Sequence, residues 1–111
     1  MHQGVAECHH NLAIAYREQG TFDRALAEAE RAVTEAEAAG DRTLTALTLR
    51  GRAETRMARG ERALAQRDLG LVREARSGLV DTVGEAEDLR VAAALMAAEG
   101  GWRPPSGHCA K

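Results

Sequence analysis

The sequence predicts an all-α protein, an α-solenoid of antiparallel helix hairpins with about five helices. Gly20, Gly60 and Gly100 lie 40 residues apart, and other small residues keep the same step, as at Ala13 and Ala53. A fixed period of about 20 to 50 residues is typical of stacked supersecondary units. The composition is rich in Ala, Leu, Glu and Arg, with one Trp, one Tyr and one Phe, which favours helix over sheet.

Glycines and capping residues divide the chain into its predicted helices. Gly20, Gly40 and Gly60 end the first three, while Thr21 and Asp41 are suitable N-caps for the second and third. We expect helices at about 4–19, 22–39, 43–59, 62–76 and 84–99. Residues 1–101 are therefore predicted to form one helical repeat domain, and residues 102–111, with two prolines, a flexible tail.

The second helix carries the clearest apolar stripe, at i, i+3, i+4 and i+7 spacing. Its members are Phe22, Ala25, Leu26, Ala29, Ala32, Val33 and Ala36. Ala65, Leu69 and Val72 repeat part of the stripe 40 residues later, and we interpret both sets as packing residues. Gly51 and Gly70 lie inside predicted helices, where each costs about 1 kcal/mol relative to Ala, and predict close helix–helix contacts.

Charge and hydropathy exclude several classes of protein. The formal net charge of −2 argues against a dedicated nucleic-acid binder, which carries a basic excess or stripe. No apolar run is long enough to span a membrane, and the N-terminus has no apolar signal core, so we expect a cytoplasmic location. Cys8 and Cys109 lie at opposite ends and do not form a secreted disulfide framework.

Residues 9–32 resemble a tetratricopeptide repeat. The residues that carry the resemblance are His9, His10, Asn11, Leu12, Ala13, Ile14, Ala15, Tyr16, Gly20, Phe22, Ala25, Leu26, Ala29 and Ala32. The resemblance implies that Leu12, Ala13 and Tyr16 pack the first helix and that Ala25 and Ala32 lie at the helix crossing. In the second unit Arg52 and Arg56 stand where Leu12 and Tyr16 do in the first. The third unit ends after its first helix, so about two and a half repeats are expected.

The resemblance also implies a function, because such repeats act as protein-interaction scaffolds without catalytic residues. The sequence itself contains no phosphate-binding glycine loop, no GxSxG turn and no HExxH pair. Forty-residue versions also look like the C-terminal halves of large bacterial transcriptional regulators. The alternative function is therefore an effector-sensing or oligomerisation segment of a regulator.

In the family, the first helix of each unit lines a concave groove that holds a peptide. Matching to the motif places in this groove Glu7, His10, Ile14, Arg17, Leu47, Arg50, Glu54, Met57, Glu87, Arg90 and Ala94. His10, Arg50 and Arg90 share one repeat position and would form a ladder able to hold an acidic segment or a chain terminus. The alternative is an ordinary surface pair between Arg50 and Glu54, worth about 0.3 kcal/mol.

Two other groups of side chains leave alternatives open. Arg52, Arg56 and Arg59 form a basic stripe that is either solvated or paired with carboxylates such as Asp68, Glu28 or Glu30. A second group, near the two ends of the chain, contains thiol and imidazole ligands suited to zinc: Cys8, His9, His10, His108 and Cys109. Because neighbouring helical residues point about 100° apart and the ends of a solenoid are distant, we expect no metal or other cofactor.

The fifth predicted helix suggests self-association. Its centre, residues 91–98, is apolar on every side, whereas a solenoid normally ends in a helix with a polar outer face. We expect Val91, Leu95 and Ala98 to stay exposed and to form a homodimer through this last helix, because the second helix of the third unit is absent. The alternative is that the missing helix belonged to a longer parent chain.

Overall fold

The computed structural model describes residues 2–99 of the 111-residue chain, and these residues form an all-α stack of helix hairpins. The five helices are α1 (His2–Glu18), α2 (Phe22–Ala39), α3 (Arg42–Ala58), α4 (Arg62–Arg76) and α5 (Thr82–Glu99). This confirms the predicted fold class, and the predicted bounds agree to within two residues at each end. The predicted tail, residues 102–111, lies outside the described residues.

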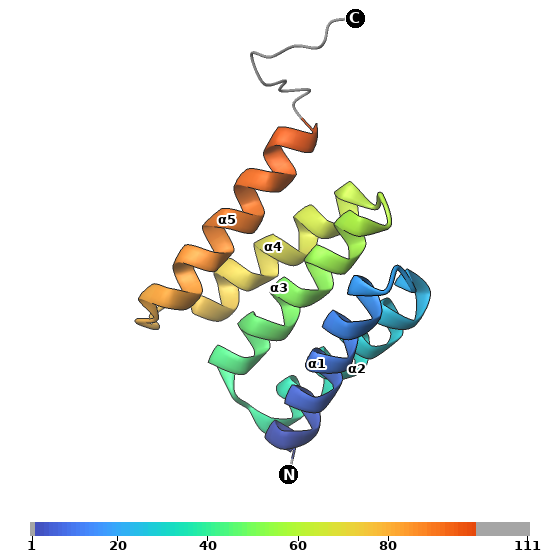
Figure 1. Cartoon of the computed structure of the whole chain (residues 1–111). Coiled ribbons are helices and arrows are strands. Elements are labelled where there is room, and N and C mark those ends of the chain that lie inside the picture. Colours follow the sequence, from blue (N-terminus) through green and yellow to red (C-terminus); the bar gives the residue numbers. More distant parts are fainter. Residues whose placement is uncertain (1, 100–111) are drawn as a thin grey trace, which may run out of the picture.

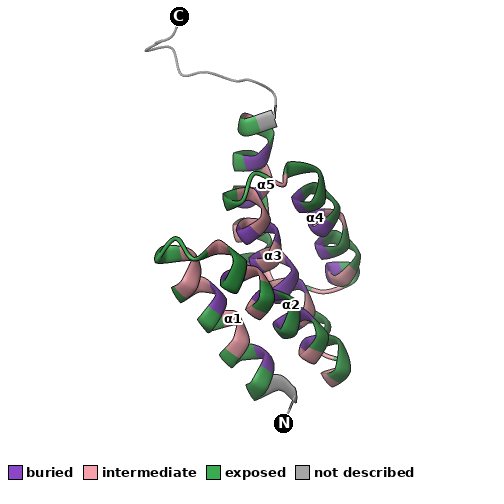
Figure 2. Ribbon diagram, turned by 90° about the vertical axis from the view of Figure 1, so that its right-hand side faces the viewer, coloured by how far each residue is buried: buried purple, intermediate pink, exposed green. Residues whose placement is uncertain are grey.

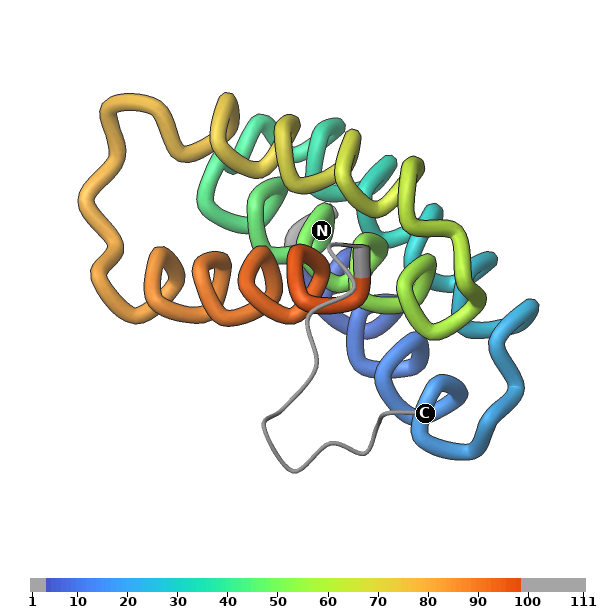
Figure 3. Tube along the Cα trace, turned by 90° about the horizontal axis from the view of Figure 1, so that it is seen from above, coloured from blue at the N-terminus to red at the C-terminus, as the bar shows by residue number. Residues whose placement is uncertain are grey.

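The helices are arranged in two layers (Figure 1). Helices α1 and α2 form one antiparallel hairpin and α3 and α4 a second, while α3 also contacts α1, α2 and α5. Viewed from above, α2 and α4 run along one side of the stack and α1 and α5 along the other (Figure 3). Helix α3, which contacts each of the other four helices, is therefore the central element.

The turns within the two hairpins repeat in atomic detail. The backbone N–H of Thr21 donates to the carbonyl of Tyr16 (2.9 Å), and 40 residues later that of Glu61 donates to the carbonyl of Arg56 (2.8 Å). Both turns need positive φ at the preceding glycine, 82° at Gly20 and 84° at Gly60. Glycine adopts this left-handed conformation without a Cβ penalty, which explains the spacing seen in the sequence.

The two predicted N-caps behave differently. Asp41 caps α3 as predicted, because its Oδ1 accepts a hydrogen bond from the backbone N–H of Leu44 (3.0 Å). Thr21 precedes α2, but its side chain makes no capping hydrogen bond. Asp81, before α5, accepts from the backbone N–H of Gly84 (3.0 Å). Aspartate therefore fixes the start of α3 and α5, whereas α2 starts from its turn alone.

Buried side chains lie on the facing sides of the helices (Figure 2). The main core cluster draws on α2 to α5 and comprises Val33, Ala46, Leu49, Ala53, Ala65, Leu69, Val72, Val91 and Leu95. A smaller cluster joins Ala6 of α1, Ala36 of α2 and Leu44 of α3. Most of the predicted stripe on α2 is buried, but Phe22 and Leu26 are only half-buried, and Leu12 of α1 remains 44 % exposed. The core is thus made mainly of small residues, which lets the helices approach closely.

The basic stripe of α3 turns inward and closes the second hairpin. Asp68 of α4 is buried, and its carboxylate accepts hydrogen bonds from Arg52 (2.8 and 3.1 Å) and Arg56 (3.0 and 3.1 Å). Arg56 also approaches Glu30 of α2 (3.7 Å), and Arg59 pairs with Asp23 and Glu61. This agrees with the internal ion-pair alternative and contradicts a fully solvated stripe. Glu28, the other predicted acceptor, pairs with His9 and Arg31 instead.

Two details of the predicted packing were wrong. A Cβ on Gly51 would lie 2.8 Å from the His10 ring, so Gly51 marks a close contact as predicted, but a Cβ on Gly70 would meet no atom within 4 Å. Val91 and Leu95 are not exposed, because α5 turns them into the main core, leaving them 1 % and 3 % accessible. Of the three residues predicted for self-association, only Ala98 is exposed.

Candidate functional site

Ion pairs across α1, α3 and α5 join four of the predicted groove residues, Arg17, Glu54, Glu87 and Arg90, and we call the predicted groove surface around them the α1–α3–α5 face. Helix α1 contributes His10, Ile14 and Arg17, and each later helix adds residues one or two repeats further along: Leu47, Arg50, Glu54 and Met57 from α3, then Glu87, Arg90 and Ala94 from α5. Exposure rises along this series, because the α1 and α3 members are half-buried while Arg90 and Ala94 are exposed. Met57 also packs against the main core cluster. Among these residues the most accessible are therefore Arg90 and Ala94 of α5, and Glu7, the remaining predicted residue, is exposed on α1.

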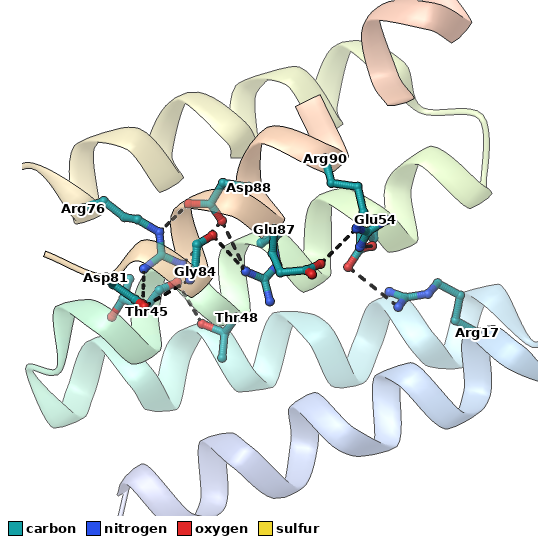
Figure 4. A network of polar contacts seen from close by, with 11 residues as sticks. Arg17, Thr45, Thr48, Glu54, Arg76, Asp81, Gly84, Glu87, Asp88 and Arg90 are labelled. Atoms are coloured by element: carbon teal, nitrogen blue, oxygen red, sulfur yellow. Dashed lines mark hydrogen bonds and ion pairs between the residues drawn. The ribbon is translucent and has the colours of Figure 1, made fainter. Parts of the chain in front are cut away.

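One chain of ion pairs crosses the face (Figure 4). Glu54 of α3 lies between two arginines, at 3.8 Å from Arg17 of α1 and 3.2 Å from Arg90 of α5. Arg90 also pairs with Glu87 on its own helix (2.9 Å), and both carboxylates raise the pKa of its guanidinium. The expected Arg50–Glu54 surface pair is thus replaced by contacts between helices.

Arg50 is committed to a second polar cluster. Its guanidinium donates to Asp88 (3.3 Å) and reaches the carbonyl of Gly84 (3.5 Å), and its side chain is 13 % exposed. Asp88 also accepts from Arg76, which pairs with Asp81 as well (Figure 4). The predicted ladder of basic groups is therefore not free to hold a ligand at Arg50, whereas Arg90 remains 59 % exposed.

Arg17 and Arg50 use the same kind of contact to join the first helix of one unit to the first helix of the next, α1 to α3 and α3 to α5. Arg17 donates to the carbonyl of Gly51 and to the hydroxyl of Thr55 (both 3.3 Å), 34 and 38 residues along the chain. Arg50 reaches Gly84 and Asp88 at the same two separations. Each of these two arginines thus approaches the carbonyl of a glycine. A pattern of arginine followed by glycine at this separation is the sequence signal that could have indicated these contacts.

His10 lies at the contact between the two hairpins. Its ring is so close to Gly51 that a Cβ there would come within 2.9 Å of Nδ1. Burial lowers the pKa of His10, and the positive charges of Arg50 and Arg17 lower it further, against a smaller opposing effect of Glu54. The imidazole is therefore held in its neutral form near pH 7 and serves as a packing group rather than as a cation.

A depression of about 310 Å³ opens at the other end of the face, between α1 and α3. It is lined by Glu7, Asp41, Thr43, Leu44 and Leu47. Glu7 and Leu47 were predicted for the groove, but the participation of the α3 N-terminus was not, because the sequence does not show how α1 and α3 lie side by side. The depression can hold an apolar side chain against Leu44 and Leu47.

The cysteine and histidine residues at the start of the chain point to different neighbours. His9 Nδ1 lies 2.5 Å from Glu28 of α2, His10 packs on α3, and Cys8 is exposed. Within residues 2–99 no three His, Cys, Asp or Glu side chains are grouped as metal ligands. His108 and Cys109 lie outside the described residues. Within residues 2–99, each helix is too short or too polar to cross a lipid bilayer.

Comparisons with known proteins find no similarity: no family model, no curated protein and no solved structure matches this chain. The resemblance of residues 9–32 to a tetratricopeptide repeat therefore stays a prediction from the sequence. The candidate site is defined by its geometry, as one face to which three helices each contribute residues.

Proposed function

We propose that the protein is a non-catalytic scaffold whose α1–α3–α5 face binds a segment of a partner protein. The observation that carries this proposal is the chain of ion pairs that joins side chains of α1, α3 and α5, with a depression lined in part by Leu44 and Leu47 at one end and an exposed arginine at the other. Binding segments with one apolar anchor and one charged contact suit such a surface. The resemblance to a peptide-binding repeat family supports the same function.

The partner segment that fits best carries a carboxylate and an apolar residue. Arg90 is the accessible cation of the face, and its pairs with Glu87 and Glu54 lie at a surface where a competing carboxylate can exchange with them. Leu44 and Leu47 would receive the apolar side chain. An acidic segment would therefore bind through Arg90 and not through Arg50, which Asp88 already neutralises.

A peptide display library, selected against the full chain, tests this function. Selected peptides are then titrated against Arg90→Glu and Leu47→Asp, with Arg67→Glu as control, because Arg67 is exposed on α4, in the opposite layer. We expect a loss of about tenfold or more in affinity for the first two variants and none for the control. If all three variants bind the peptides with the affinity of the original chain and keep its helix content by circular dichroism, binding at this face is contradicted.

A further inference from the structure

Helix α5 leaves one apolar side uncovered. Leu89 is 71 % and Met96 69 % exposed, and Ala93 between them is exposed as well. The residues one repeat earlier are buried, with Leu49 at 3 % and Ala53 at 0 %. The difference arises because α4 covers α3, whereas within residues 2–99 no helix covers this side of α5. The open side therefore continues, in register, an interface that the preceding hairpin has closed.

A pocket adjoins the exposed stripe where α4 and α5 meet. It has a volume of about 410 Å³ and is lined by Arg73, Arg76, Ser77, Glu85, Asp88 and Leu89. Leu89 thus belongs both to the stripe and to the pocket wall. An exposed apolar side chain next to a pocket of this size is typical of a surface that packs against another chain.

The charges around the pocket are complementary to one another. Arg76 pairs with both Asp88 and Asp81, and Asp88 also pairs with Arg50, so these four charges balance one another. Arg73 and Glu85 line opposite walls, on α4 and α5, and neither has an ion-pair partner among the described residues. The pocket therefore presents one unpaired positive and one unpaired negative charge, and Leu89 is the apolar residue of its lining. A surface of this kind is complementary to itself, since a two-fold rotation brings each charge onto its opposite.

We propose that two copies of this chain associate about a two-fold axis beside Leu89. Arg73 of each copy pairs with Glu85 of the other, and the Leu89–Met96 stripes of the two α5 helices cover one another. The four charges that line the pocket sum to zero, so two identical surfaces meet without net repulsion. The α1–α3–α5 face takes no part, and self-association is therefore independent of the proposed peptide binding.

The dimer is expected to be weak. Its apolar centre is a few side chains on one helix, less than the roughly 800 Å² per partner of a standard stable interface. A dissociation constant on the order of 10 μM is consistent with such a surface. Sedimentation equilibrium of the full chain, across about a hundredfold range of concentration around this value, should show a reversible monomer–dimer equilibrium. A monomer at every concentration, or an assembly larger than a dimer, would overturn the proposal.

Charge reversal tests the pairing itself. Arg73→Glu or Glu85→Arg alone should raise the dissociation constant at least about tenfold, because each places like charges opposite one another. The double variant Arg73→Glu/Glu85→Arg should return to within about threefold of the original value. Since neither residue has an ion-pair partner within residues 2–99 of its own chain, recovery in the double variant must come from contact between copies. A double variant no tighter than the single ones would contradict the two-fold pairing.

The apolar centre has a matched control on the same helix. Leu89→Asp should abolish the dimer, while Val83→Asp should leave it unchanged, because Val83 is equally exposed (75 %) but lies about 120° away around α5. Thermal unfolding by circular dichroism shows whether both variants remain folded. Equal dissociation by both substitutions would show that the interface is not centred on Leu89.

Discussion

In the first hairpin, Ala13 of α1 and Ala25 and Ala29 of α2 are buried, whereas in the second the α3–α4 interface encloses Asp68, which is bound by Arg52 and Arg56. The two hairpins nevertheless share their 40-residue register and the hydrogen bonds of their turns. Their common features are the glycine turns and the small residues at the helix crossings. The register therefore depends on backbone geometry and close approach, and it tolerates different chemistry between the helices.

One position shows the difference directly. Glu28 of α2 and Asp68 of α4 are one repeat apart, and each carboxylate faces the first helix of its own hairpin. Glu28 meets His9 in a half-buried setting, while Asp68 is 2 % exposed at the side chain and compensates two arginines. The second hairpin should therefore be far more sensitive than the first to loss of its carboxylate.

Removing the two carboxylates should produce the largest effect. Asp68→Ala leaves two largely buried guanidinium groups without their main partner, and we expect it to lower the free energy of unfolding by about 3 kcal/mol. Glu28→Ala should cost about 1 kcal/mol or less, because Arg31, the arginine paired with Glu28, is 67 % exposed and remains solvated without it. Urea unfolding at pH 7 measures both. Similar losses in the two variants would show that the hairpins are not held differently.

Replacing the whole charged cluster separates the cost of an uncompensated charge from the value of the ion pairs. The variant Arg52→Leu/Arg56→Tyr/Asp68→Ala gives α3 the residues that α1 has at the same positions. Removing all three charges together leaves only Glu30 without its arginine, and this carboxylate is 52 % exposed, so the stability should lie within about 1 kcal/mol of the original. A loss as large as that of Asp68→Ala alone would show that the ion pairs contribute substantial net stability.

Substitutions at the starts of α2 and α3 should differ in their effect on the free energy of unfolding, but by a smaller amount. Asp41→Ala removes the hydrogen bond to the backbone of Leu44 and should cost about 1 kcal/mol. Thr21→Ala removes no capping hydrogen bond and should cost only a few tenths of a kcal/mol. Denaturant unfolding of the two variants compares them. A larger loss for Thr21→Ala would contradict the turn-based start of α2.

The two helical glycines should respond in opposite ways to alanine. Gly70→Ala should stabilise the protein by up to about 1 kcal/mol, since alanine is the better helix former and its Cβ meets nothing. Gly51→Ala has the same intrinsic gain but displaces the His10 ring, so we expect no net stabilisation. Thermal unfolding at low protein concentration compares the two. Combining Gly51→Ala with His10→Ala removes the steric conflict and serves as the control for its cause.

Acidification should weaken the contact between the hairpins through His10. Its pKa is lowered in the folded state by burial and by Arg50 and Arg17, so the unfolded chain takes up the proton more readily. The contribution of neutral His10 to stability is complete above about pH 6.5, the pKa of histidine in the unfolded chain. It is lost as the pH falls through the lowered pKa of His10 in the folded state. His10→Gln should reduce the slope of unfolding free energy against pH between about 5 and 7. An unchanged slope would exclude His10 as the titrating group.

The sequence alone determined the fold class, the helix bounds and the turns. These features depend on local signals, namely the glycines that permit positive φ, the Asp41 cap and the apolar stripe of α2. Such signals involve residues that are close in the sequence, so they can be recognised without the tertiary structure. Repeat position also suggested which helix sides align, and the structure joins Arg17, Glu54 and Arg90 by ion pairs, while the groove itself stays a prediction. For the basic stripe of Arg52, Arg56 and Arg59 the sequence predicts two alternatives, a solvated face or internal ion pairs.

Only the tertiary structure decided how the charges pair and which side of α5 is covered. The apolar residues of α5 are spread all round the helix, so their spacing does not distinguish Val91 and Leu95, which are buried, from Leu89 and Met96, which are exposed. The contact between Arg50 and Asp88 was also not predictable from the sequence, because the two residues are 38 positions apart. They meet only because of the position of α5 along α3. Burial and ion pairing are set by the relative placement of whole helices, and that placement is a property of the assembled stack rather than of any segment.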